Sequence, residues 1–118
     1  MQEDFVTQRE FWPNREQGGL KFIQSLVATL YGVTTSDLFA SKRGGRRVVF
    51  ARHIAMYLMH MVFGCSLTEV ARFFGRERGS ASYALHKVED LREDPCFDRQ
   101  LTQLENLIRS AADIEVLQ

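Results

Sequence analysis

Apolar residues recur at helical spacing along most of the chain, and no stretch shows the alternation of a half-buried strand. The clearest pattern predicts a long helix over about 47–63 with a wide apolar face. Arg52, Met56 and His60 are each four residues apart and are expected in one row on the opposite side. Gly64 is expected to end this helix. The pattern therefore indicates an all-α fold.

The stretch from Ser66 to Leu91 predicts two shorter helices joined by a tight turn. Ser66 and Glu69 have the spacing of a capping box, in which a hydroxyl and a carboxylate satisfy the amides at a helix start. Gly75 can adopt the left-handed conformation that ends the first helix. In the second helix an apolar stripe leaves the polar residues on the outer face; the stripe is Ala81, Ala84, Leu85, Val88 and Leu91.

Two short helices with such a turn and a cationic outer face are typical of a helix-turn-helix that reads DNA, although many helical hairpins share the pattern.

A helix over about 20–31 precedes the long helix, with an apolar face formed by Leu20, Ile23, Val27 and Leu30. A single helical turn is expected next, capped by Thr35 or Ser36.

The two ends of the chain read differently from the middle. Residues 1–19 contain Trp12-Pro13 and Gly18-Gly19, which interrupt regular structure, and are interpreted as an N-terminal arm. Residues 113–118 are interpreted as a C-terminal tail, so the domain spans 20–112. Its last helix, about 98–112, is expected to close the core or meet a partner through Leu101, Leu104, Leu107, Ile108 and Ala111.

Charge is strongly segregated although the 118-residue chain is formally neutral. Nine of its 15 Lys and Arg residues, but only two of its 15 Asp and Glu residues, lie between Lys42 and Lys87, which gives this span a net charge of +7 and the remainder −7. A basic region set against acidic ends is typical of a surface that binds a polyanion.

The segment Ser41–Arg47 places four cations around two glycines without an apolar residue. Such a segment is not core, and it reads as a flexible basic loop. It is either a solvated turn or a loop that contacts phosphates or a DNA groove.

Several classes of function find no support in the sequence. No apolar window has the length of a membrane span, and the first residues lack the basic head of a signal peptide, which favours a cytoplasmic protein. Cys65 and Cys96 form no Cys-x-x-Cys pair, and the three histidines have no neighbouring third ligand, so neither a metal nor a cofactor is expected. Isolated carboxylates and the absence of a nucleophile motif indicate that the protein is not an enzyme.

With the basic loop, the long helix and the helix pair in this order, the chain resembles the C-terminal DNA-binding domain of the bacterial replication initiator DnaA over about residues 20–111. The resemblance implies a compact helical bundle that contains a helix-turn-helix, of the kind shared by the Trp repressor and the DnaA C-terminal domain. The segments that carry it are Ile23–Ala28, Ser36–Leu38, Ser41–Arg43, Ala51–Leu58 (Ala-Arg-His-Ile-Ala-Met-Tyr-Leu), Ser66–Val70 and Lys87–Leu91.

The resemblance also implies roles for individual residues. An arginine of the basic loop would read the minor groove, with Arg43 the best match and Arg46 and Arg47 close behind. Arg52 matches an arginine at the DNA side of the long helix. His60 falls where the family has a basic contact, and Thr68 falls where the first helix of the pair approaches DNA.

The chain departs from the family where bases are read. The family opens its recognition helix with Asp-His-Thr-Thr-Val, and this chain has Glu77-Arg78-Gly79-Ser80-Ala81. Glycine removes a hydroxyl and a methyl group that could touch thymine, and arginine prefers a guanine edge or a phosphate. The preferred DNA sequence is therefore expected to differ from the family's usual origin box.

The sequence thus predicts a protein that binds double-stranded DNA and regulates replication initiation or transcription. The alternative is a protein-interaction adaptor that kept the fold and lost DNA binding. No Gly-x-x-x-x-Gly-Lys-[Ser/Thr] loop is present, so no nucleotide is expected. A homodimer or a protein partner, bound through residues 1–19 or the last helix, is left open. The candidate DNA contacts are Lys42, Arg43, Arg46, Arg47, Arg52, His60, Thr68, Arg76, Glu77, Arg78, Gly79, Ser80, Ser82, Tyr83 and Lys87.

Overall fold

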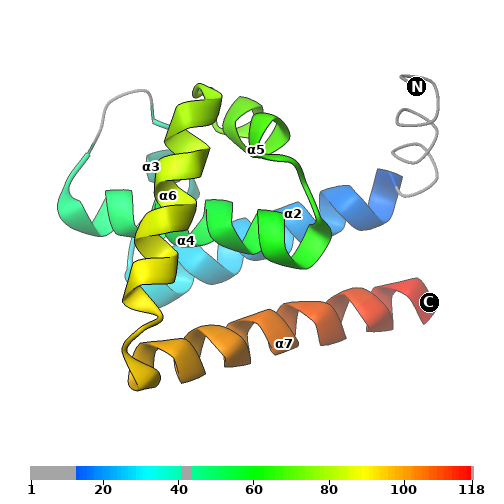
Figure 1. The fold of residues 1–118 in the computed structure, drawn as a ribbon. Coiled ribbons are helices and arrows are strands. Elements are labelled where there is room, and N and C mark those ends of the chain that lie inside the picture. Colours follow the sequence, from blue (N-terminus) through cyan, green and yellow to red (C-terminus); the bar gives the residue numbers. More distant parts are fainter. Residues whose placement is uncertain (1–12, 41–43, 118) are drawn as a thin grey trace.

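The computed structural model of the chain describes residues 13–40 and 44–117, with side chains over 19–40 and 44–111. This part contains helices and no strand, as the sequence predicts (Figure 1). The helices are Pro13–Tyr31 (α2), Thr35–Phe39 (α3), Arg46–Phe63 (α4), Leu67–Phe73 (α5), Arg78–Leu91 (α6) and Pro95–Leu117 (α7).

Helix α4 is the centre of the fold, because α2, α3, α5, α6 and α7 all pack against it. Its bounds and its end at Gly64, with φ +69°, agree with the prediction. The row predicted on the side opposite the apolar face does not agree with the structure, because Met56 is only 1% exposed and Arg52 only 4% exposed. A helix surrounded on all sides has no solvent face over its middle turns, and the sequence pattern of α4 alone does not show that it is surrounded.

Helix α2 begins seven residues earlier than predicted, at Pro13, and runs through the glycine pair. Proline at a first helical position is tolerated, because the amide it lacks has no intrahelical partner there. Gly19 is buried, and a Cβ at this position would lie 2.3 Å from the ring of Phe63, so glycine permits close packing of α2 on α4. Of the expected arm, residues 1–12 lie outside the described residues.

The face predicted for α2 is only partly buried. Ile23 and Val27 are fully buried, but Leu30 is 52% exposed and lies outside the core. In the single turn that follows, Thr34 is the cap instead of Thr35 or Ser36. Its hydroxyl accepts from the amide of Asp37 at 3.0 Å, and its own amide donates to the Asp37 carboxylate at 3.1 Å.

Helix α7 packs against α2 and α4 and closes the core along one side of the molecule (Figure 1). Closing the core was one of the two alternatives predicted for the last helix. Leu101 and Ile108 are buried, whereas Leu107 is 49% exposed, contrary to the prediction. The helix extends from Pro95 to Leu117, through residues interpreted as a tail. In the described part of the chain, no helix is both long enough and apolar enough to cross a membrane.

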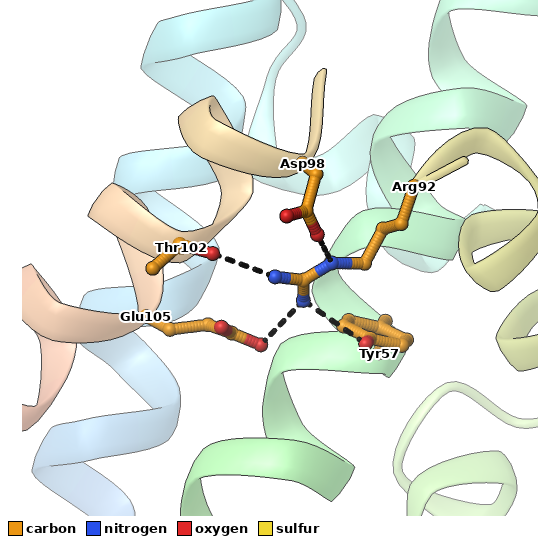
Figure 2. A network of polar contacts seen from close by, with 5 residues as sticks. All are labelled: Tyr57, Arg92, Asp98, Thr102 and Glu105. Atoms are coloured by element: carbon orange, nitrogen blue, oxygen red, sulfur yellow. Dashed lines mark hydrogen bonds and ion pairs between the residues drawn. The ribbon is translucent and has the colours of Figure 1, made fainter. Parts of the chain in front are cut away.

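The junction of α6 and α7 is held by a network around Arg92 (Figure 2). Its guanidinium donates to Asp98 at 2.5 Å, to Glu105 at 2.9 Å, to the Tyr57 hydroxyl at 3.1 Å and to Thr102 at 2.7 Å. Burial would lower the pKa of Arg92, but the hydrogen bonds to Asp98, Glu105 and Tyr57 outweigh it and raise the pKa above its ordinary value. Glu105 is 7% exposed and was not predicted to be buried.

Candidate nucleic-acid interface

The predicted helix-turn-helix is formed by α5, α6 and the residues between them. The capping box is present: the Ser66 hydroxyl accepts from the Glu69 amide at 3.1 Å, and the Glu69 carboxylate accepts from the Ser66 amide at 2.8 Å. Gly75 makes the turn with φ +67°. Glu77 stands before α6 and its side chain makes no capping hydrogen bond.

Helix α6 presents to solvent the face that its sequence predicts. Ala81, Ala84 and Val88 are buried against the rest of the fold. Leu91, the last residue of the predicted apolar stripe, is 43% exposed, contrary to the prediction. The outward positions of the helix are exposed apart from Ser82, which is half-buried; the exposed ones are Arg78, Gly79, Ser80, Tyr83, His86 and Lys87.

An open cleft of about 940 Å³ separates the outer face of α6 from the start of α4. Arg46 lies on the α4 wall and Lys87 on the α6 wall, so both walls carry positive charge. The cleft brings together about half of the candidate contacts predicted from the sequence: Arg46, Arg52, Arg76, Gly79, Ser80, Tyr83 and Lys87.

Tyr83 is the most exposed large apolar side chain among the described residues, at 56%. His53 of α4 packs edge-on against its ring at a centroid distance of 5.7 Å, and Lys87 Nζ lies over the ring at 5.7 Å. His53 was not among the DNA contacts predicted from the sequence. Its separation of seven residues from Arg46 puts both on one face of α4, and this spacing could have indicated that it lines the cleft.

Arg52 faces the interior instead of the solvent. Its Nε donates to the carbonyl oxygen of Leu38 at 2.8 Å and its Nη2 to that of Asp37 at 2.9 Å. These carbonyls belong to the last turn of α3, where helix carbonyls lack intrahelical partners; that of Asp37 also accepts from the Ala40 amide at 3.3 Å. Burial lowers the pKa of Arg52, the charge of Arg76 lowers it further, and Asp37 raises it. These bonds give Arg52 a structural role at the end of α3, and its DNA contact stays a prediction.

Arg76 joins the turn of the helix-turn-helix to the end of α3. Its Nη2 donates to the Ala40 carbonyl at 2.9 Å and its Nη1 to the Phe74 carbonyl at 3.0 Å. Phe39 stacks on Phe74 beside them, at a centroid distance of 5.0 Å. The chain therefore enters the basic segment from a point fixed relative to α6. Lys42 and Arg43 themselves lie outside the described residues.

Other predicted residues lie apart from the cleft. Arg47 is exposed on the first turn of α4, and Thr68 is exposed on the first turn of α5. His60 is about 20 Å along α4 from Arg46, and its Nδ1 donates to the Cys65 carbonyl at 2.7 Å. Glu77, Arg78 and Ser82 belong to the start and outer face of α6 but do not line the cleft.

Comparison with known proteins places these observations in context. A family model described as the bacterial DnaA protein helix-turn-helix matches residues 20–88. A structure described as a DNA replication initiation factor is 32% identical with a TM-score of 0.76, over 87% of this chain and 32% of that one. A replication initiator DnaA bound to AMPPCP and single-stranded DNA is 30% identical with a TM-score of 0.73, over 90% of this chain and 32% of that one. This chain therefore spans about a third of the length of either structure.

Proposed function

Because this chain belongs to the family of the bacterial DnaA helix-turn-helix, we propose that it binds duplex DNA through α6 and the start of α4. In this proposal α6 enters the major groove, whose width admits a helix, and the basic segment before α4 reaches the adjacent minor groove. The observation that carries the proposal is the cleft with cations on both walls between these two elements.

The shape of the cleft supports this arrangement. In a duplex, one sugar-phosphate strand separates the major groove from the neighbouring minor groove. A protein that reads both grooves needs a channel for that strand between its two reading elements. Arg46 and Lys87 would neutralise phosphates of the strand from opposite walls, and such contacts supply most of the salt-dependent affinity.

Individual roles are assigned from charge and from position in the chain. Arg46, Arg47 and Lys87 would contact the backbone, while Lys42 and Arg43 would enter the minor groove. Arg76 lines the cleft while its guanidinium donates to the Ala40 carbonyl. Arg78, Ser80, Ser82 and Tyr83 would face bases, and Glu77 and Gly79 complete the proposed surface of α6. Thr68 and His60, which lie apart from the cleft, stay predicted contacts implied by the family resemblance.

The biological role proposed is regulation of replication initiation or transcription by occupying duplex sites at the nucleoid in the cytoplasm. The nucleotide-dependent work of a complete initiator is not proposed for this chain, because its sequence has no phosphate-binding loop. The basis for a role in replication initiation is that the chain matches the DnaA family and a structure described as a DNA replication initiation factor.

Fluorescence anisotropy of a labelled duplex in a salt series tests the proposal. If about six phosphates are neutralised, log affinity should fall with log salt at a slope near −5. Arg46→Ala should flatten the slope by about 0.9, the effect of one lost phosphate contact. Arg99→Ala removes an exposed cation of α7, away from the cleft, and should leave the slope unchanged.

The family's origin box and a scrambled duplex should be compared in the same series. Equal, salt-steep binding to both would indicate a DNA binder with altered specificity, and selection from a random pool would then find its site. Absence of binding to either duplex at low salt would overturn the proposal and favour the protein-interaction adaptor.

A further inference from the structure

Gly79, in the first turn of α6, has no structural reason to be glycine. Its φ is not positive, unlike that of Gly75, and a Cβ built on it would meet no atom within 4 Å. At Gly19, by contrast, the same added atom would collide with Phe63. Because glycine is a poor helix former, its presence in an exposed first turn is not explained by the fold. What it provides is open space on the outer surface of the helix.

Tyr83 lies one turn further along α6, on the same face as Gly79. The Tyr83 ring does not fill the space at Gly79, since no side-chain atom lies within 4 Å of a Cβ built there. Both residues line the cleft. The ring is held in place by the edge-on contact with His53 and by Lys87 above it.

An exposed aromatic ring of fixed orientation beside an empty space is suited to an apolar group of a partner. Arg46 and Lys87 flank this site, so the partner's apolar group should be close to negative charge. In the major groove of DNA the apolar group is the C5-methyl of a pyrimidine, which thymine carries and which 5-methylcytosine also carries.

We propose that Tyr83 contacts the C5-methyl group of a pyrimidine, and that the space at Gly79 admits this base edge. The contact would make Tyr83 a specificity-determining residue, in place of the side chain that Gly79 lacks. This inference rests on the duplex binding proposed above and adds to it a chemical group and a residue that reads it.

The test uses duplexes that the wild-type chain selects from a random pool, measured by anisotropy at fixed salt. Each thymine is replaced in turn by uracil, which removes only the methyl group. At one position this replacement should weaken wild-type binding about three- to fivefold, the effect of losing one buried methyl group. Tyr83→Phe keeps the ring and should show the same loss of affinity. Tyr83→Ala should bind the thymine and uracil duplexes with equal affinity.

A second arm replaces single cytosines by 5-methylcytosine. A gain in wild-type affinity that Tyr83→Ala lacks, without a loss on uracil, would assign the contact to methylated DNA and support the proposal. Gly79→Val should fill the open space and weaken binding to the selected duplex more than tenfold. Its circular dichroism spectrum should remain that of the wild type, because a Cβ at this exposed position meets nothing within 4 Å.

The proposal fails if duplexes bind but neither replacement distinguishes wild type from Tyr83→Ala. It fails equally if Tyr83→Phe behaves as Tyr83→Ala, since the hydroxyl and not the ring would then make the contact, or if no sequence is selected. Failure of the duplex binding itself has a different signature, because no variant and no wild-type protein would then bind at low salt.

Discussion

The guanidinium of Arg76 donates a hydrogen bond of 2.9 Å to the carbonyl oxygen of Ala40, which lies 36 residues earlier in the chain. A second bond to the Phe74 carbonyl fixes the arginine on its own turn. Two elements that are remote in sequence are thereby joined: the turn that precedes α6 and the residue that precedes the basic segment. The arrangement positions one proposed DNA-reading element relative to the other.

Arg76→Lys should separate this positioning from charge. Lysine keeps the positive charge but lacks the planar fork that bridges two carbonyl oxygens. We expect duplex affinity to fall about three- to tenfold, the effect of roughly 1 kcal/mol for a lost hydrogen bond, with the salt slope unchanged. Arg72→Lys, on the exposed side of α5, is the matched control and should change neither quantity. Wild-type affinity in Arg76→Lys would contradict the positioning role.

Arg52→Met should destabilise the protein without altering its salt response. The substitution removes the guanidinium donors from the carbonyl oxygens of Leu38 and Asp37, at a side chain that is 4% exposed. The free energy of unfolding, measured in urea, should fall by about 2–3 kcal/mol. The slope of log affinity against log salt should match that of the wild type. A slope flattened by about 0.9 would instead return Arg52 to the phosphate contacts.

The network around Arg92 predicts a strong coupling with Glu105. Arg92→Met alone leaves the buried Glu105 carboxylate without its ion pair (Figure 2) and should lower the free energy of unfolding by about 3 kcal/mol. Arg92→Met combined with Glu105→Leu removes both charges, and most of that loss should be recovered. Additive effects in the double-mutant cycle would show that the two side chains do not interact energetically.

Two glycine-to-alanine substitutions should change the stability of the protein in opposite directions. Gly19→Ala places a Cβ 2.3 Å from the Phe63 ring, which must shift, and should destabilise the protein by about 1 kcal/mol. Gly79→Ala meets nothing within 4 Å and should stabilise α6 by about 0.5–1 kcal/mol. Thermal unfolding of both variants in one buffer gives the comparison. If both substitutions stabilised or both destabilised the protein, the space around one of these glycines would differ from that described.

Local patterns in the sequence predicted the features that depend on near neighbours. The capping box of Ser66 and Glu69, the left-handed ends at Gly64 and Gly75, and the bounds of α4 agree with the structure. Each is decided within four or five residues, by a hydrogen bond or a backbone angle that the local sequence specifies. The outward face of α6 was predicted for the same reason, since helical periodicity determines which residues share a side.

The interior of the fold depended on which faces find a partner, and periodicity does not contain that information. Leu30 and Leu107 continue apolar stripes yet stay exposed, because no side chain among the described residues covers them. Glu105 is buried because Arg92 meets it across a turn. A charged side chain enters the interior only where a partner compensates its desolvation, and that partner can lie anywhere in the chain.

For the proposed site, the sequence by itself determined the supply of cations and the exposed face of a recognition helix. Tertiary structure decided which partner each of these side chains contacts. It turned Arg52 inward to the carbonyls of α3, assigned Arg76 to Ala40, and brought His53 against Tyr83. The physical reason is that charge and periodicity are properties of a segment, whereas a hydrogen bond between distant segments exists only after the helices have packed.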